Sequence, residues 1–482
     1  MDLLALSAET IIEGIKNRSF TAKDVVSAYY KVIKAKDKDI SAFLTLCEEN
    51  AFRSAEILDE KIRLGLPIGK LAGVPIAIKD NICTEGLRTT CASKILEDFV
   101  PPYNATVIDK LISEDAIIIG KTNMDEFAMG SSNENSAYQI TKNPRDLTCV
   151  PGGSSGGSAA VVAATMAPLS LGSDTGGSIR QPASFCGLVG LKPTYGLVSR
   201  YGLIAFGSSL DQIGPLSKNV RDSALLLEVI AGEDKMDSTS HKGAIEIDYL
   251  NGIEKGVQGL KIGVPTEFFM EGLDEEIALS IKGSIKILKE LGAEVEEISL
   301  PDAGEGLAAY YIISSAEASS NLARFDGIRY GYRTKEYDNL DDLIEKSRSE
   351  AFGAEVKRRI MLGTYVLSSG YYDAYYNRAQ KFRKKLKEMY NEVFKKYDLI
   401  LGPTSPVLPF KIGEKSGNPL EMYLADIYTT NINLAGLPAI SLPCGLSKSG
   451  LPIGLQIIAA PFKEKIILMA AFALEKQLQL NL

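Results

Sequence analysis

Residues 172–182 read Gly-Ser-Asp-Thr-Gly-Gly-Ser-Ile-Arg-Gln-Pro, and the interpretation of the whole chain depends on this stretch. Because Gly176 and Gly177 have no Cβ, consecutive backbone N–H groups can point into one cavity, as an oxyanion-binding site requires. Ser178 follows immediately, where a nucleophile would meet a carbonyl carbon. A plain glycine-serine turn between a strand and a helix would have the same composition, so the stretch alone leaves both interpretations open.

A second stretch rich in glycine and serine lies directly upstream. Residues 151–158 read Pro-Gly-Gly-Ser-Ser-Gly-Gly-Ser and are followed by small apolar residues at 159–164. This pattern predicts a tight turn at the start of a helix, where N–H groups and hydroxyls crowd together. A phosphate-binding loop or a flexible turn has the same pattern. Across residues 151–214 apolar runs interrupt the glycines and serines, which indicates ordered structure rather than a linker.

Further upstream, Lys79 follows the apolar residues 71–78, which predict a buried strand. Lysines usually lie on the surface, but burial would lower the pKa of this amine and allow it to accept a proton. The chain has one histidine, His241, in a polar segment that predicts a solvated loop. A Ser-His-Asp mechanism is therefore disfavoured, and a desolvated lysine is the best candidate for the base.

Strand and helix patterns alternate through most of the chain. Residues 6–59 predict helices, one of which has Thr21 as its N-cap. Strands are predicted at 116–119, 259–264, 293–298 and 398–403, and helices at 106–113, between Asp274 and Gly292, and at 371–397. This alternation predicts an α/β fold with a mostly parallel or mixed sheet.

The composition is that of an ordered globular protein, since 45% of the 482 residues are hydrophobic and 24% are charged. The net charge of −8 argues against a broad phosphate-binding face, so we expect a partner to hold any RNA. The six cysteines form no C-x-x-C pair, and no metal site is expected. No apolar run could span a membrane and no secretion signal is visible, so a cytoplasmic protein is expected.

The three chemistry-bearing segments together resemble the motifs of the amidase signature family. They are Ile-Lys-Asp-Asn at 78–81, Gly-Gly-Ser-Ser-Gly-Gly at 152–157 and Asp-Thr-Gly-Gly-Ser at 174–178. They occur in the family's order and with similar spacing, and the similarity extends from about residue 71 to 215. The resemblance is specific because all three segments match together.

The resemblance implies a catalytic triad made of Lys79, Ser178 and a second serine in a cis peptide, Ser154. It also implies the family's fold, an α/β structure in which helices cover both faces of a large mixed sheet. The implied organisation is a single amidase domain over residues 1–482, with a helical region at about 1–65, a catalytic core at about 66–231 and a remainder that completes the sheet and the glutamine pocket.

Three further segments resemble one group within that family, the A subunits of amidotransferases that act on glutamyl-tRNA(Gln) or aspartyl-tRNA(Asn). They lie at 120–132, 209–215 and 317–327. This likeness implies that Ser178 attacks the side-chain amide of glutamine, while Ser154 passes the proton between Ser178 and Lys79. The oxyanion would be stabilised by N–H groups around Thr175, Gly176 and Gly177.

The same likeness implies a pocket for free glutamine, which Tyr310 would line. Arg359 would hold the α-carboxylate with its forked guanidinium, and Asp426 would accept hydrogen bonds from the α-ammonium. Arg358 is an alternative to Arg359, and plain surface charges on helices would give the same sequence.

The implied assembly is a heterotrimer with B and C subunits, in which the B subunit binds misacylated tRNA and uses ATP and Mg²⁺. This chain would hold no cofactor of its own. Gly120-Lys121-Thr122 is similar to the end of a phosphate-binding loop, but Asp115 occupies the position of that loop's first glycine. Two alternatives stay open, a stand-alone amide hydrolase of the same family and a non-catalytic scaffold or nucleotide-binding protein.

Overall fold

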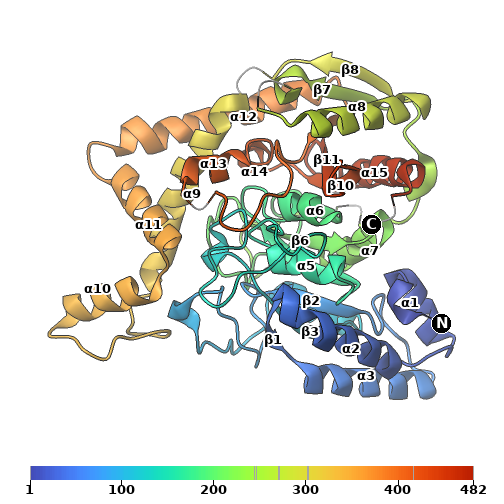
Figure 1. The fold of residues 1–482 in the computed structure, drawn as a ribbon, viewed down its shortest axis with the longest axis horizontal. Helices are drawn as coiled ribbons and strands as arrows, with labels where there is room; N and C mark the ends of the chain where they lie inside the picture. The colour runs from blue at the N-terminus through green and yellow to red at the C-terminus, as the bar shows by residue number, and fades with distance from the viewer. Residues whose placement is uncertain are drawn as a thin grey trace.

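The computed structural model describes residues 2–243, 245, 247–269, 272–300, 303–415 and 417–480, and this part is built on one sheet of eleven strands (Figure 1). The strands are β1 (Phe43–Leu46), β2 (Pro75–Lys79), β3 (Ile117–Thr122), β4 (Leu169–Asp174), β5 (Val189–Lys192), β6 (Gln212–Ser217), β7 (Lys261–Pro265), β8 (Glu294–Ile298), β9 (Leu399–Pro403), β10 (Ala439–Leu446) and β11 (Pro452–Ala459). Their order across the sheet is β1-β3-β2-β4-β6-β5-β10-β11-β9-β7-β8.

The sheet is mixed, which confirms the predicted fold class. β2 runs parallel to β3 and β4, and β7 runs parallel to β8 and β9. The other neighbouring strands are antiparallel. Every residue of β2, β4 and β11 is buried, and strands covered on both faces are largely apolar instead of alternating between apolar and polar residues.

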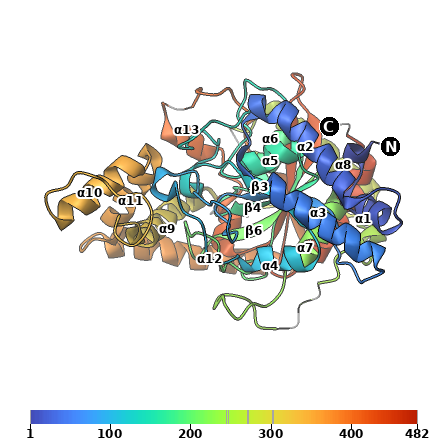
Figure 2. The ribbon, with the colours of Figure 1, turned by 90° about the horizontal axis from the view of Figure 1, so that it is seen from below.

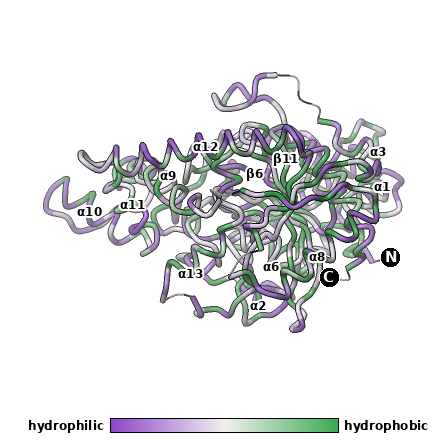
Figure 3. The backbone as a smooth tube through the Cα atoms, turned by 90° about the horizontal axis from the view of Figure 1, so that it is seen from above, coloured by the Kyte–Doolittle hydropathy of each residue, from purple (hydrophilic) through white to green (hydrophobic). Residues whose placement is uncertain are grey.

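Helices cover the sheet on both faces. In Figure 2, β3, β4 and β6 lie between α5 and α6 on one side and α4 and α7 on the other. Hydrophobic residues gather around β6 and β11, whereas α10 and α12 are largely hydrophilic (Figure 3). The described α-helices are α1 (Ala8–Lys16), α2 (Ala22–Ile40), α3 (Glu48–Arg63), α4 (Thr106–Ser113), α5 (Gly156–Ala163), α6 (Arg180–Cys186), α7 (Val220–Ile230), α8 (Glu275–Glu290), α9 (Gly306–Asn321), α10 (Leu340–Ala351), α11 (Ala354–Leu367), α12 (Arg378–Val393), α13 (Pro419–Leu424), α14 (Thr430–Ala435) and α15 (Glu464–Leu478). None of the helices described is long and apolar enough to cross a membrane.

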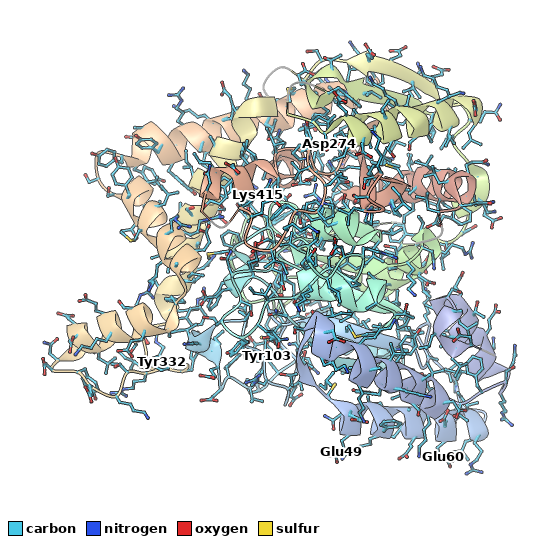
Figure 4. The ribbon with its side chains drawn as sticks, viewed as in Figure 1. Glu49, Glu60, Tyr103, Asp274, Tyr332 and Lys415 are labelled. Atoms are coloured by element: carbon cyan, nitrogen blue, oxygen red, sulfur yellow. The ribbon has the colours of Figure 1, made fainter. Side chains whose placement is uncertain are left out.

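Local sequence signals set several helix ends. Thr21 and Asp24 form a reciprocal capping box at the start of α2, and the Asp274 side chain caps α8, as predicted. On the outer side of α3, Glu49 and Glu60 point away from the sheet, and each forms an ion pair within the helix (Figure 4).

Two segments differ from the prediction. Residues 43–46, predicted as helix, form the edge strand β1, because Ser41 in a left-handed conformation ends α2 and the next residues pair with β3. The predicted helix at 371–397 begins instead with a short π-helix, Tyr372–Asn377, and continues as α12. At β1, a tertiary pairing overrides the local preference of the sequence.

Candidate active site

Lys79 lies where two neighbouring strands end. β2 ends at Lys79 and its parallel neighbour β4 ends at Asp174, so their carboxyl ends meet at the same edge of the sheet. The Lys79 Nζ donates hydrogen bonds to the hydroxyls of Ser154 at 2.7 Å, Ser155 at 2.8 Å and Ser173 at 2.9 Å. The side chain is completely buried, so hydroxyl oxygens take the place of water around the amine.

Burial lowers the pKa of Lys79 to about 7, although the carboxylates of Asp125, Asp174 and Asp211 each raise it. Removing an ammonium group from water is unfavourable, whereas a neutral amine keeps its contacts with the hydroxyls. A large share of the Lys79 side chains is therefore uncharged near neutral pH. An uncharged amine at 2.7 Å from the Ser154 hydroxyl can accept its proton.

The two predicted catalytic serines lie in adjoining turns. The Gly153–Ser154 peptide bond is cis, and the next residue, Ser155, directly precedes α5. The Ser155 N–H donates to the carbonyl oxygen of Ser178 at 3.2 Å, which joins this turn to the one before α6. Ser178 is 8% exposed, and its hydroxyl makes no hydrogen bond to any described residue. The structure brings Lys79, Ser154 and Ser178 into one region and leaves the Ser178 hydroxyl available to a ligand.

The residues between β4 and Ser178 provide backbone donors. In the described part of the chain, the N–H groups of Thr175, Gly176 and Ser178 make no hydrogen bond. The Gly177 N–H instead donates to Asp174 Oδ1 at 2.8 Å and is not free. This corrects the predicted donor set at Gly177, because the direction of an N–H group depends on turn geometry that composition does not reveal. Three N–H groups without a partner among the described residues remain in the turn that carries Ser178.

A buried ion pair fixes this turn. Arg180 donates from Nε to Asp174 Oδ2 and from Nη2 to Asp174 Oδ1, both at 3.0 Å, and both side chains are completely buried. Asp174 also accepts from the Ile179 N–H at 3.1 Å, so its carboxylate spans the turn around Ser178. Burial alone would raise the pKa of Asp174, but the charge and hydrogen bonds of Arg180 outweigh it and hold the pKa below its ordinary value.

Tyr310, on α9, lies directly against the donor turn. A Cβ atom built on Gly176 would lie 2.5 Å from Tyr310 Cζ, so only glycine leaves room for the ring. Burial raises the pKa of Tyr310, while Arg359 lowers it and Asp426 raises it, which indicates that both charged groups lie near the phenol. The three residues predicted to bind glutamine are therefore gathered beside Gly176.

Arg359 projects from α11, one of the helices that extend away from the sheet on the left of Figure 1. Its guanidinium lies over the rings of Tyr311 at 4.4 Å and Tyr423 at 4.9 Å, and its Nε donates to Glu355 Oε1 at 2.7 Å. Its Nη1 atom is buried and has no hydrogen-bond partner among the residues that the structure describes. Arg358 has a half-exposed side chain paired with Glu355. Of these two arginines, Arg359 is thus the one with a buried donor that no described residue pairs with.

Asp426 offers a complementary unpaired acceptor. Its Oδ2 accepts a hydrogen bond from the Ser131 hydroxyl, whereas its Oδ1 is buried without a partner in the described part of the chain. Burial raises the pKa of Asp426 to about 7, and the bond from Ser131 offsets part of this rise. A buried polar atom without a partner costs roughly 1–3 kcal/mol, more if charged. An amino acid, with an α-carboxylate and an α-ammonium, could satisfy Arg359 Nη1 and Asp426 Oδ1 together.

Sequence reasoning missed the residues that hold these charged groups, namely Ser131, Ser155, Ser173 and Glu355. Ser155 and Ser173 lie inside the two glycine- and serine-rich stretches, so their contact with a buried lysine could have been considered. Glu355 is four residues before Arg359 on α11, a spacing that places both on one helix face. Ser131 has no local signal, because its partner Asp426 is 295 residues away in the chain.

His241 differs from its predicted solvated state. Its ring centroid lies 4.2 Å from that of Phe462, and its N–H donates to the carbonyl oxygen of Gly196, so the residue is half-buried. Among the residues that the structure describes, no group of three or more His, Cys, Asp or Glu side chains could hold a metal ion.

Comparison with known proteins defines the class of this chain. Residues 24–468 match the sequence model of the Amidase family, and the chain belongs to that family. It is 67% identical to the second A subunit of glutamyl-tRNA(Gln) amidotransferase of Clostridium acetobutylicum, over 99% of this chain and 100% of that protein. Its structure is similar to that of the glutamyl-tRNA(Gln) amidotransferase A subunit from Thermotoga maritima, with 44% identity, a TM-score of 0.81 and coverage of 99% of this chain and 95% of that one. A bacterial aryl acylamidase of the amidase signature family is also similar, with 26% identity, a TM-score of 0.86 and coverage of 98% and 96%.

Proposed function

We propose that this chain is the glutamine-hydrolysing A subunit of a glutamyl-tRNA(Gln) amidotransferase. Its 67% identity to a protein of that name, over nearly the whole of both chains, supports the proposal. The structural observation that carries it is the pair of unpaired buried atoms, Arg359 Nη1 and Asp426 Oδ1. Free glutamine has a charged group for each of them, whereas a simple amide has none.

In the proposed first step, the Ser178 oxygen attacks the side-chain carbonyl carbon of glutamine. The Ser178 proton moves to Ser154, whose own proton moves to the uncharged amine of Lys79. The carbonyl oxygen becomes an oxyanion, which the free N–H groups of Thr175, Gly176 and Ser178 stabilise. Loss of one such donor typically costs roughly 3 kcal/mol of transition-state stabilisation.

In the second step the C–N bond breaks and ammonia leaves, taking the proton back from Lys79 by way of Ser154. A glutamyl ester remains on Ser178. A water molecule then attacks the ester with the same proton relay, which releases glutamate and restores the Ser178 hydroxyl. The sum is glutamine and water converted to glutamate and ammonia.

The ammonia is proposed to serve a partner subunit. We infer that a B subunit binds misacylated Glu-tRNA(Gln) and uses ATP and Mg²⁺ to activate its glutamyl group, which ammonia then converts to glutaminyl. A C subunit would complete a cytoplasmic heterotrimer. The net charge of −8 on this chain fits such a division of labour, because a surface of that sign does not favour contact with RNA phosphates.

The test is to produce the chain with candidate B and C subunits and to measure ammonia release from glutamine with and without ATP and misacylated tRNA. The wild type is expected to release ammonia, and Ser178→Ala to lose this activity by several orders of magnitude, because the acyl acceptor is gone. Release by Ser178→Ala at the wild-type rate would refute the assignment.

A stand-alone amide hydrolase is the second candidate, and the likeness to an aryl acylamidase favours it. Such an enzyme would hydrolyse small amides without α-charges as readily as glutamine. Its rate would also be indifferent to the partner subunits and to tRNA. Preference for glutamine by a large factor in kcat/KM would exclude this second function.

A further inference from the structure

Two buried acidic side chains that the proposed mechanism does not use, Asp125 and Glu126, are neighbours in the chain at the start of the 3-10 turn η3 (Glu126–Ala128). Burial raises the pKa of each carboxyl to about 7, which reflects the unfavourable transfer of two acidic groups out of water. Asp125 accepts hydrogen bonds from two backbone N–H groups and Glu126 from one, and the two side chains contact different parts of the site.

Asp125 joins the turn that carries Ser154 to a loop that follows η3. Its backbone N–H donates to the Ser154 carbonyl oxygen at 3.2 Å, and a Cβ atom on Gly153 would collide with Asp125 Oδ2. The carboxylate is therefore packed against this turn. It also accepts from the N–H groups of Asn133 at 2.9 Å and Asn135 at 3.1 Å, so one side chain holds both segments together.

The loop held by Asp125 reaches the ammonium side of the proposed glutamine pocket. The hydroxyl of Ser131, which lies in this loop, donates a hydrogen bond to Asp426. The Ser131 carbonyl oxygen accepts from Gln181 Nε2 at 2.9 Å, and Gln181 Oε1 accepts from the Gly153 N–H at 2.9 Å. Hydrogen bonds through Gln181 thus connect the Ser131 loop with the turn that carries Ser154, in addition to the connection through Asp125.

Glu126 caps the helix that carries Arg359. α11 begins after Gly353, which has no side chain to cap the helix itself. Glu126 Oε2 accepts from the Gly353 N–H at 2.8 Å, and Oε1 accepts from the Ser93 hydroxyl. A carboxylate at this position satisfies a donor that the helix leaves unpaired and interacts favourably with the helix dipole. Glu126 therefore holds the start of α11 at Gly353, six residues before Arg359.

We propose that Asp125 and Glu126 are positioning residues for glutamine hydrolysis. Asp125 aligns Ser154 with the ammonium side of the pocket, and Glu126 sets α11 so that Arg359 meets the α-carboxylate. The inference rests on the proposed function, because it takes glutamine as the substrate. If the two residues have these roles, replacing Asp125 should affect the reactivity of Ser178, and replacing Glu126 should affect glutamine binding. If both only stabilise the fold, either replacement should simply reduce the amount of active enzyme.

Glu126 is tested by glutamine kinetics of the complete assembly. Glu126→Ala is expected to raise KM about tenfold and to leave kcat within about twofold, the size of effect that loss of one helix cap can produce. Glu126→Gln keeps an acceptor for the Gly353 N–H and should stay near the wild type. Glu126→Asp keeps the charge but is too short to reach Gly353, so it should raise KM as alanine does, and it serves if the alanine variant does not fold.

The matched control is Asp222→Ala. Asp222 is a buried carboxylate that accepts from the Ala8 N–H at the start of α1, so it caps a helix that carries none of the proposed site residues. Its replacement should lower the thermal midpoint of unfolding and leave the KM for glutamine unchanged. An unchanged KM in both Glu126→Ala and Glu126→Asp, or an equal KM rise in Asp222→Ala, would overturn the role of Glu126.

Asp125 is tested without glutamine, by the rate at which a serine-directed sulfonyl fluoride modifies Ser178. Asp125→Asn places an amide N–H₂ group against one of two backbone N–H donors, so we expect labelling about tenfold slower, whereas Glu126→Ala should label at the wild-type rate. Equal rates in wild type and Asp125→Asn would overturn the role of Asp125. If the wild type labels at Ser178 but releases no ammonia from glutamine, the proposed function fails, while the labelling comparison still decides on Asp125.

Discussion

The Lys79 amine contacts three neutral hydroxyls and the Ser173 carbonyl oxygen, and it forms no ion pair with any described residue. At Lys121, another buried lysine, the carboxylate of Asp80 lies 3.9 Å away and favours the ammonium form, although burial still lowers the pKa of Lys121 overall. A hydroxyl group can hydrogen-bond to the amine in either of its protonation states, because a hydroxyl can both donate and accept. The absence of a charged partner in direct contact among the described residues fits the proposed role of Lys79 as a base.

Separate substitutions of Arg358 and Arg359 would show which of the two adjacent arginines binds glutamine and which is only a surface charge. Arg359→Ala should raise the KM for glutamine roughly tenfold to a hundredfold, since it removes a charged hydrogen-bond donor to the α-carboxylate. Arg358→Ala should leave KM within about twofold, because its half-exposed side chain contributes little. Steady-state kinetics of both variants would check this. A larger KM effect from Arg358→Ala would show that Arg359 is the wrong choice for the carboxylate.

For single residues, the sequence allows the types of site residues to be predicted, but not the directions in which their donor and acceptor groups point. Lys79, Ser154 and Ser178 are marked by the motifs around them. The occupied N–H of Gly177 is not marked, because it depends on the path of one turn around Asp174. The contact between Ser131 and Asp426 could not be predicted either, since nothing local in either segment indicates it.

Among the elements, the turn between β4 and α6 is held by several buried hydrogen bonds of Arg180. Arg180 approaches Asp174 with two parallel hydrogen bonds inside the protein, and it also donates to Gln456 Oε1 at 2.6 Å and Asn433 Oδ1 at 2.6 Å. These contacts tie the serine-bearing turn to β11 and α14, which are formed by the last part of the chain. The turn that carries Ser178 is thus held by segments from both halves of the chain.

Replacement of Arg180 by methionine should destabilise the protein by about 3–5 kcal/mol, because it leaves a buried carboxylate uncompensated. Denaturant unfolding would measure the loss. The Asp174 pKa lies below its unfolded value near 3.9, so this stabilisation is present above that pH and is lost as the pH falls through the folded pKa. Asp174→Asn combined with Arg180→Met should recover part of the stability, and no recovery would contradict the electrostatic explanation.

Helices with a clear apolar period could be predicted. α4 matches its predicted range although no side chain caps it, and α8 begins at its predicted Asp274 cap. β1 could not be predicted, because a four-residue strand at the sheet edge exists only through its pairing with β3. The π-helical start at Tyr372–Asn377 could not be predicted either, since its tyrosines fit an ordinary helical run.

For the whole molecule, the sheet is continuous from strands near the N-terminus to strands near the C-terminus (Figure 1). An α/β fold with a mixed sheet follows from the alternation of elements, but the strand order does not. β5 pairs with β10, and β9 lies between β11 and β7, so the pairings join segments far apart in the chain. Such pairings depend on the total packing of the core and have no signature in a local window.

If the chain only supplies ammonia, an external source should replace it. An assembly with Ser178→Ala, given ATP and misacylated Glu-tRNA(Gln), is expected to form no Gln-tRNA(Gln) from glutamine. Added ammonium chloride should restore product formation to a rate comparable with the wild type, because the partner's own chemistry is intact. Separation of the aminoacyl-tRNAs would measure this. A failure of ammonium to restore the reaction would mean that Ser178 contributes more than ammonia.

The central claim is that an uncharged Lys79 activates Ser178 through Ser154. The most direct measurement is the pH dependence of Ser178 modification by a sulfonyl fluoride, with the labelled residue located by peptide mass spectrometry. Because burial lowers the pKa of Lys79 to about 7, the rate should rise with pH through that value and then level off, and Lys79→Ala should abolish labelling. Labelling of Lys79→Ala at the wild-type rate, or modification at a different serine, would contradict it.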